Sequence, residues 1–425
     1  MLYRRAVLAG FGSVVAASAA TRHAQAQTAP EGDDLAGPEA FDQVWETVRD
    51  RFFDPRLNGL DWPAVRTRYR PLLLAAASAD ARADVINTML AELRASHTEY
   101  LLPDQTAYYQ IADIFLDPRR PDLRRFFPDG EITYPGISVL TRRDAQGRTF
   151  VIGAIDGGPA ARAGLLAGDE IVAADGAAFR EVDSFRGKVG SNVTLSIRRT
   201  ASGPVLTVPV VPETLHPDEM FRQGLEASAR IIRGAGSARI GYVHVWSYAG
   251  YVYQRTLERL IGQGILSDAD ALVWDLRDGW GGAVPEYLDV FDPRGPTVAM
   301  IGRNGQVHLQ GVKWRRPVAM LINGGTRSGK EILAYGFKKY RFGELIGTPT
   351  LKAVLAATAF MMRDGSLLML AVDDVRVDGE RLEGVGVTPT IEVPFDFDYS
   401  AGADPQLARA VEILSADVMA RPKPG

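Results

Sequence analysis

The sequence predicts a multidomain α/β (α+β) protein with a helical N-terminal region, a β-rich middle region and an α/β core. Its 425 residues are too many for one ordinary hydrophobic core. Apolar residues first recur at helical spacing, then alternate as in strands, and finally form continuous strands separated by amphipathic helices. Together with the signal-like layout of the first residues, these changes of period predict five parts. They are a signal peptide (1–26), the helical region (38–112), the β-rich domain (123–213), the core (214–400) and a C-terminal helix and tail (401–425).

The first residues have the layout of a secretory signal. A basic start precedes a short apolar run, and the small residues Ala24 and Ala26 fit a cleavage site after Ala26. The pair Arg4 and Arg5 also permits a twin-arginine signal. We therefore expect a periplasmic or secreted protein, and retention of this segment would add peripheral membrane association.

The composition limits the chemistry. With 46% hydrophobic residues, 24% charged residues and a net charge of -4, the chain is typical of a soluble globular protein and not of one that binds nucleic acid. The chain has no cysteine, which excludes disulfides and a thiol nucleophile, so an acyl-transfer enzyme of this sequence would attack through oxygen. No metal-ligand spacing or phosphate loop occurs, and we expect no cofactor and no metal.

The helical region carries two amphipathic segments, PEAFDQVWETVRDRFFDP and ARADVINTMLAELRASH. It ends in a loop that holds SHTEYLLP.

The β-rich region contains ITYPGISVL, RTFVIGAI and VTLSIRRT, separated by glycine-rich turns. Several short motifs of this region resemble those of a PDZ domain. They are the YPGI stretch, the runs Gly158-Pro159-Ala160 and Ala163-Gly164-Leu165, and Gly168-Asp169-Ile171 with Asp175-Gly176. A PDZ groove accepts an extended peptide as an added strand and cradles its terminal carboxylate on backbone N–H groups. The resemblance implies a peptide-binding loop at Tyr134, Pro135, Gly136 and Ile137, and protein or peptide substrates.

From about residue 216 strands alternate with helices, in the order ARIGYVHVWSY, YQRTLERLIGQG, ALVWDLRDGWGG, VAMLING, KEILAYGFKKY and GELIGTP. This order predicts a largely parallel sheet covered by helices, whose active site lies beyond the C-terminal ends of the strands. The segments DGWGG and NGGTRSG both fall at such ends. His244 shares a strand face with Trp246 and is expected to be a core or groove-lining residue.

Ser328 stands between the buried strand PVAMLIN and the helix EILAYGFKK. The free N–H groups at a helix start stabilise negative charge, so this position suits a nucleophile with the N–H of Gly329 as an oxyanion donor. Alternatively, Ser328 caps the helix and Glu331 completes a capping box, because S-x-x-E is that signature.

Three motifs resemble those of the carboxyl-terminal processing proteases and their tricorn-type relatives. The D-L-R-x-x-x-G-G run matches Asp275 to Gly282, the N-x-G-T-x-S-x-x-E run matches Asn323 to Glu331, and the G-x-G-V-x-P run matches Gly384 to Pro389. The resemblance implies a core of the crotonase-like, processing-protease type and a serine endopeptidase. It makes Ser328 the nucleophile, with an oxyanion hole formed by Gly281 or Gly282 together with Gly329.

The expected base departs from the processing proteases, which carry a lysine 25 residues after the serine. Ala353 stands at that position, and Lys352 is one place early, which on a strand reverses the side-chain direction unless the strand bulges. Lys330 would point to another face of the helix. Both lysines remain alternative bases, and each is otherwise expected to have a solvated surface role.

A histidine is the favoured base. Of five histidines, His97 follows a helix pattern in a loop, where catalytic groups are often found. Its S-H-T context resembles the histidine motif of the tricorn-type branch, which implies His97 as general base, Ser96 as a supporting residue and Glu383 as the carboxylate. A histidine with a near-neutral pKa needs no large shift for this task, whereas a lysine does.

Two functions follow from these motifs. One is a serine endopeptidase that captures protein tails or unstructured segments through its PDZ domain and cleaves them through an acyl-enzyme. The other is a catalytically inactive member of the fold that binds peptides or lipophilic molecules, and the absence of the aligned lysine is its main support.

Overall fold

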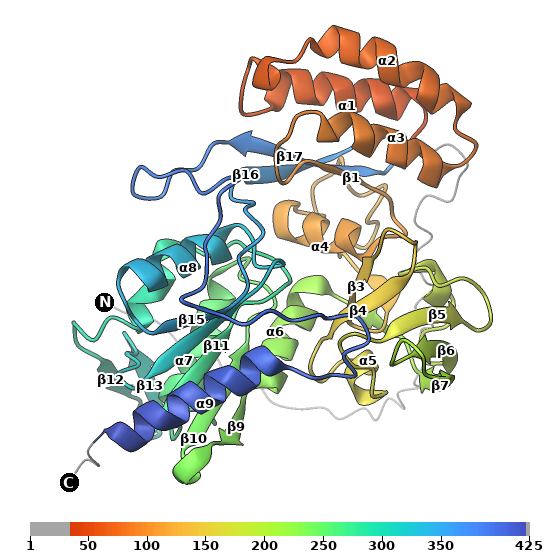
Figure 1. The fold of residues 1–425 in the computed structure, drawn as a ribbon. Coiled ribbons are helices and arrows are strands. Elements are labelled where there is room, and N and C mark those ends of the chain that lie inside the picture. Colours follow the sequence, from red (N-terminus) through yellow and green to blue (C-terminus); the bar gives the residue numbers. More distant parts are fainter. Residues whose placement is uncertain (1–34, 422–425) are drawn as a thin grey trace, which may run out of the picture.

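The computed structural model describes residues 35–421, so the predicted signal peptide lies outside the described residues. Figure 1 shows three bodies: helices α1 to α3 at one end, a β-rich domain to one side, and an α/β core crossed by the long C-terminal helix. The mixed α/β fold class predicted from the sequence is confirmed. No helix in the described range 35–421 is long and apolar enough to cross a membrane.

The N-terminal helices pack on a small sheet built partly from the far end of the chain. Asp61 and Ser78 cap two of the helices through the backbone N–H groups of Ala64 and Ala81. The sheet has the antiparallel order β1-β17-β16, and its apolar face joins the helices in one core. The elements are α1 (Pro38–Arg51), η1 (Leu57–Gly59), α2 (Trp62–Ala75), α3 (Ala79–Ala91), β1 (Glu99–Leu101), β16 (Ala356–Met361) and β17 (Leu367–Asp373).

The β-rich domain is a five-stranded antiparallel sheet of order β3-β4-β5-β6-β7 around its own apolar core. A short ladder of β2 with β8 and the helix α4 join it to the rest of the chain. The elements are α4 (Thr106–Phe115), β2 (Tyr134–Gly136), β3 (Val139–Arg143), β4 (Thr149–Ala154), α5 (Pro159–Arg162), β5 (Glu170–Ala174), η2 (Asp183–Phe185), β6 (Val193–Arg198), β7 (Val205–Val210) and β8 (Glu213–Leu215).

The core holds a six-stranded sheet of order β18-β15-β14-β11-β10-β9, in which only β9 runs antiparallel to its neighbour. Both faces are buried, as a parallel sheet requires. The elements are α6 (Pro217–Ser228), β9 (Arg230–Arg233), η3 (Ala235–Ser237), β10 (Arg239–His244), α7 (Tyr251–Gly262), β11 (Ala271–Asp275), η4 (Pro285–Val290), β14 (Val318–Ile322), α8 (Gly329–Lys339), β15 (Glu344–Gly347), β18 (Ile391–Glu392) and α9 (Pro405–Ala420).

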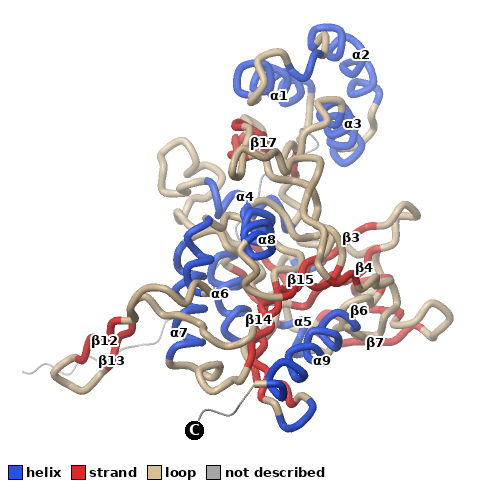
Figure 2. Tube along the Cα trace, turned by 60° about the vertical axis from the view of Figure 1, so that its left-hand side comes forward, coloured by secondary structure: helices blue, strands red, loops and turns tan. Residues whose placement is uncertain are grey.

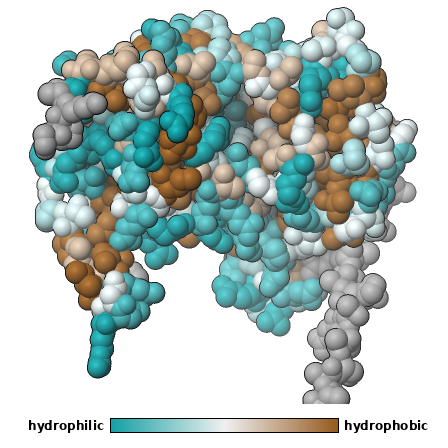
Figure 3. All heavy atoms as spheres, turned by 90° about the horizontal axis from the view of Figure 1, so that it is seen from below, coloured by the Kyte–Doolittle hydropathy of each residue, from teal (hydrophilic) through white to brown (hydrophobic). Residues whose placement is uncertain are grey.

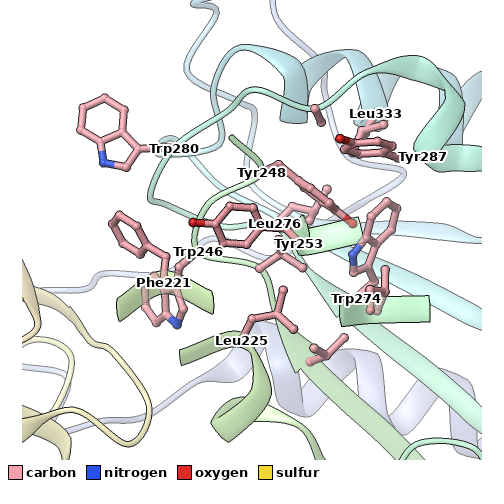
Figure 4. Packing of buried hydrophobic residues seen from close by; sticks show 14 of the residues in the cluster. Phe221, Leu225, Trp246, Tyr248, Tyr253, Trp274, Leu276, Trp280, Tyr287 and Leu333 are labelled. Carbon is pink, nitrogen blue, oxygen red and sulfur yellow. The ribbon is translucent and has the colours of Figure 1, made fainter. Parts of the chain in front are cut away.

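The two faces of this sheet are covered by different helices. On one face α6, α7 and α8 pack against a cluster rich in aromatic residues, drawn in Figure 4 around Tyr248, Tyr253 and Trp274. On the other face α9 covers the sheet through Ala410 and Leu414. The alternation of strands and helices predicted from the sequence is therefore confirmed for this region.

A hairpin of β12 (Val298–Ile301) and β13 (Val307–Gln310) projects from the core, as Figure 2 shows. Val298, Met300 and Ile301 are exposed on it. Seen from below in Figure 3, hydrophobic patches alternate with hydrophilic ones, which is usual for protein surfaces.

Candidate active site

Two loops at the same edge of the parallel sheet bring Gly281 beside Ser328. Strands β11 and β14 are neighbours in parallel register, so the loops that follow them leave the sheet side by side. A Cβ atom added at Gly281 would lie 2.5 Å from the Cβ of Ser328, and one added at Gly329 would lie 2.4 Å from the backbone of Ala283. Only glycine at these two positions permits such a close approach.

Ser328 occupies a strained turn between β14 and α8. Its backbone has φ 56° and ψ -131°, a region that residues with a side chain rarely adopt. The side chain makes no capping hydrogen bond, and Glu331 instead accepts hydrogen bonds from the Thr350 hydroxyl and from the N–H groups of Lys352 (3.0 Å) and Ala353 (2.7 Å). The serine half of the capping box is therefore absent. Glu331 holds the segment 350–353 against the start of α8 and also interacts with the backbone N–H of Ser328.

Three N–H groups near Ser328 have no acceptor in the described part of the chain. Among the hydrogen bonds of residues 35–421, none is donated by the N–H of Gly281, Gly282 or Gly329. Because Gly281 and Gly329 lie directly against Ser328, free donors converge where a reacting carbonyl oxygen would carry negative charge.

Ser96, His97 and Glu383 form a connected hydrogen-bond network. Glu383 accepts hydrogen bonds from the N–H (3.0 Å) and the hydroxyl (2.9 Å) of Ser96, and the same hydroxyl lies 2.9 Å from His97 Nδ1. The loop that carries Ser96 and His97 leads into β1, and the pairing of β1 with β17 fixes the position of this loop. Ser96 thus links His97 to a carboxylate that stands 287 residues further along the chain.

This network fixes the tautomer of His97. A hydroxyl has one proton, and Ser96 uses it to donate a hydrogen bond to Glu383, so its oxygen accepts a hydrogen bond from the Nδ1–H group of His97. The lone pair of Nε2 is then free to accept another proton. Burial, and next the charge of Arg327, lower the pKa of His97 to about 4 against the opposing effect of Glu383, which keeps the ring neutral at ordinary pH.

One peptide group connects this network to the nucleophile loop. The carbonyl of Ala353 accepts from the N–H of Ser328 (2.7 Å), while the N–H of Val354, in the same peptide group, donates to Glu383 (2.8 Å). Within the described residues no hydrogen bond joins the Ser328 hydroxyl to His97. Such hydrogen bonds are often long before substrate binds.

The two lysines have different environments. Lys352 is exposed on the segment held by Glu331, in accord with a surface role. Lys330, expected in solvent, is fully buried, and its Nζ donates to the carbonyls of Asp278 (2.7 Å) and Trp246 (3.2 Å). The expectation was wrong because these acceptors come from loops that precede Lys330 by 52 and 84 residues. Burial lowers the pKa of Lys330 to about 7.

The remaining predicted residues lie away from Ser328. His244 is buried and stacks on Trp246 at 3.6 Å between ring centroids, as its strand pattern predicted. Tyr134 and Ile137 are only 2% and 1% exposed, so their side chains face the core, and any contact of this stretch with a peptide would use backbone groups. Beside it, a cavity of about 250 Å³ is lined by Ser138 and Gly158.

Sequence reasoning missed two residues of the site, Arg327 and Trp280. Both line a cleft of about 1110 Å³ that runs between the β-rich domain and the core. The Arg327 guanidinium carbon lies 4.5 Å from the centre of the Trp280 ring. The only available signal was position, since each residue directly precedes a predicted site residue.

Three parts of the chain match known protein families. Residues 239–393 match the model of peptidase family S41, residues 37–91 match the tricorn protease C1 domain, and residues 150–199 match a PDZ domain. The chain is 27% identical to the chloroplastic carboxyl-terminal-processing peptidase 2 of Arabidopsis thaliana over 84% of this chain and 69% of that protein. It is 26% identical to tricorn protease homolog 1 of Streptomyces coelicolor over 89% of this chain but only 35% of that protein.

Among solved structures, the tricorn protease is 19% identical with a TM-score of 0.51, covering 90% of this chain and 37% of that one. Mature CPAF is 14% identical with the same TM-score of 0.51, covering 90% of this chain and 98% of that one. These two likenesses concern the fold.

Fold, motifs and matches together define a peptidase of the S41 type that carries a PDZ domain. Within that class, the chain is similar over most of its length to carboxyl-terminal processing proteases. The family recognised from the sequence motifs is thereby confirmed.

Proposed function

We propose that this chain is a serine endopeptidase in which Ser328 attacks the peptide carbonyl and His97 is the general base. The observation that carries the proposal is the chain of hydrogen bonds from Glu383 through Ser96 to His97, which leaves Nε2 of the ring free. The peptide group 353–354 ties the same carboxylate to the backbone of Ser328.

The reaction follows from these groups. His97 Nε2 takes the proton of the Ser328 hydroxyl as the oxygen attacks, and the N–H groups of Gly281 or Gly282 with Gly329 stabilise the oxyanion. The imidazolium then gives its proton to the leaving amine, and water hydrolyses the acyl-enzyme by the same route. Ser96 and Glu383 hold the ring and stabilise its charged form.

Labelling by a fluorophosphonate probe tests the nucleophile and the base together. We expect the wild-type chain to be labelled at Ser328, Ser328→Ala and His97→Ala to lose the label, and Lys352→Ala to keep it. A folded wild-type chain that is never labelled would instead favour the inactive, peptide- or lipophile-binding member of the fold. Loss of labelling in Lys352→Ala but not in His97→Ala would contradict the histidine base.

The PDZ domain is proposed to capture protein C-terminal or unstructured segments and to deliver them to the cleft. The match of residues 150–199 to a PDZ domain supports this role, as does the cleft between that domain and the core. A short PDZ-binding peptide added in trans should change the rate of cleavage if the groove also gates the site. An unchanged rate would count against gating.

A periplasmic or secreted location is proposed from the signal-like residues 1–26. Determination of the N-terminus of the protein exported by its host tests this, and a mature chain that begins at Gln27 is the expected result. Recovery of the uncleaved chain in the cytoplasm would contradict it.

A further inference from the structure

The side chain of Arg327, directly before the nucleophile, has no hydrogen-bond partner among the residues that the structure describes. It lines the cleft, and its Nε atom is buried yet makes no hydrogen bond within residues 35–421. Among residues 35–421 it forms no ion pair within 4.0 Å. By contrast, Arg142 and Arg277 of the same cleft are ion-paired with Asp398 and Asp275. Arg327 thus differs from these two arginines in having its charge uncompensated by direct contact.

The guanidinium of Arg327 is held in place by an anchored aromatic ring. It lies over Trp280, whose indole N–H donates to Gln110 (2.7 Å) and whose backbone N–H donates to Trp246 (2.8 Å). Trp280 sits at the edge of the aromatic cluster in Figure 4, away from Tyr248 and Trp274. This contact holds the guanidinium over the ring but satisfies none of its N–H donors.

The nearby carboxylates are engaged elsewhere or lie further away. Asp278 accepts a hydrogen bond from Asn323 (2.9 Å), and Glu331 holds the segment 350–353. Glu99, on β1, interacts with Arg327 through space and lines the same cleft. A guanidinium remains charged in proteins, so a partly buried one without a partner favours an anion from outside the chain.

We propose that Arg327 recognises a carboxylate of the substrate close to the scissile bond. The planar fork of a guanidinium matches a carboxylate with two parallel hydrogen bonds. Arg327 directly precedes the nucleophile, and extended chain advances about 3.3 Å per residue, so the carboxylate belongs within about two residues of the cleaved bond. It is either the free C-terminus of the substrate or the side chain of an aspartate or glutamate. This inference rests on the proposed cleft being the substrate site.

Binding to a catalytically silent chain tests the inference without requiring turnover. Ser328→Ala, with and without Arg327→Gln, is titrated with four peptides of one sequence. They carry a free C-terminus or an amide, combined with glutamate or glutamine near the bond to be cleaved. We expect a carboxylate to tighten binding about tenfold to a hundredfold through Arg327, the range of a charge-assisted hydrogen bond. Arg327→Gln should remove this preference, and Arg327→Lys should restore part of it.

The four peptides separate the two sources of the carboxylate. A preference for the free C-terminus assigns Arg327 to the substrate's end, and a preference for glutamate assigns it to an acidic side chain; either result supports the proposal. Equal binding of all four peptides to the chain with Arg327 intact would overturn it. So would an equal weakening of all four by Arg327→Gln, since that indicates a structural role alone.

Glu99→Gln is the matched control. If Glu99 competes with the substrate for Arg327, its replacement increases the carboxylate preference. If Glu99 is the true partner of Arg327, both replacements destabilise the chain alike and neither alters peptide preference, which would overturn the proposal. Fluorophosphonate labelling of the chain with Ser328 intact is scored separately, so that failure of the peptidase proposal and failure of carboxylate recognition give different results.

Discussion

The two halves of the candidate site come from regions that are built differently. The nucleophile half, Gly281 and Ser328, stands on adjacent parallel strands of a buried sheet. The base half, Ser96, His97 and Glu383, joins a loop before β1 to a turn 287 residues later. Sheet pairing positions the first half directly, whereas the second depends on a few hydrogen bonds that converge on one carboxylate and on the peptide group 353–354.

This difference implies that substitutions in the two halves will fail in different ways. In the nucleophile half an added atom meets backbone and must displace it. In the base half, removing a side chain frees the loop from its hydrogen bonds and changes which atom carries the proton. Geometric damage and damage to proton transfer can therefore be told apart by experiment.

The largest effect is expected for His97→Ala. Loss of the general base should lower kcat/KM by about 10²- to 10⁴-fold, the usual contribution of proton transfer. Added imidazole should restore part of the activity, because the vacated space lies beside Ser96. Lys352→Ala is the control and should keep full activity, since Lys352 is exposed. Equal losses in both variants would show that the base half does not act through His97.

Gly281→Ala should damage the nucleophile half by geometry alone. The new Cβ would meet the carbonyl oxygen of Arg327 at 2.9 Å and the N–H of Gly329 at 3.0 Å. The two loops must separate, and kcat should fall about 10²- to 10³-fold through loss of oxyanion donors.

Gly324→Ala is the matched control for this substitution. It changes a glycine of the Ser328 loop where a Cβ meets nothing within 4 Å, and kcat should not change. Imidazole should not rescue Gly281→Ala. A Gly281→Ala chain with full activity would remove Gly281 from the site.

The dependence of kcat/KM on pH separates the two candidate bases by a smaller effect. Because the pKa of His97 is lowered to about 4, the ring accepts a proton from Ser328 at all higher pH values. Activity should fall about tenfold per pH unit only below pH 4. A base at Lys330, whose pKa is about 7, would give that fall already below pH 7. A fall in kcat/KM below pH 7 that is absent from Lys330→Met would therefore assign the base to the nucleophile half.

Sequence reasoning reached the two halves by different routes. Strand and helix periodicity placed Gly281 and Ser328 at strand ends, because the signal for a parallel sheet is local. The position of His97 in a loop after a helix made it a candidate, but its link to Ser96 and Glu383 came only from a family resemblance, since no local pattern reports a contact across 287 residues. The sheet of β16 and β17 under the N-terminal helices was not predicted for the same reason. The stacking of Arg327 on Trp280 likewise depends on how two loops meet.

Lys330 offers the smallest effect and tests how rigidly the nucleophile half is built. As a neutral amine it has two protons, one for each carbonyl that it contacts. Its pKa falls from 10.5 to about 7 on folding, so between these values the unfolded chain binds a proton that the native chain does not. The free energy of unfolding of the wild type should therefore rise with pH, relative to Lys330→Met, by about 1 kcal/mol per unit from pH 7 to pH 9. Denaturant unfolding at these two pH values measures the difference between the chains. If the free energy of unfolding depends on pH in the same way in both chains, Lys330 stays charged when folded. The Asp278 and Trp246 loops would then be joined by a cation and not by a neutral donor.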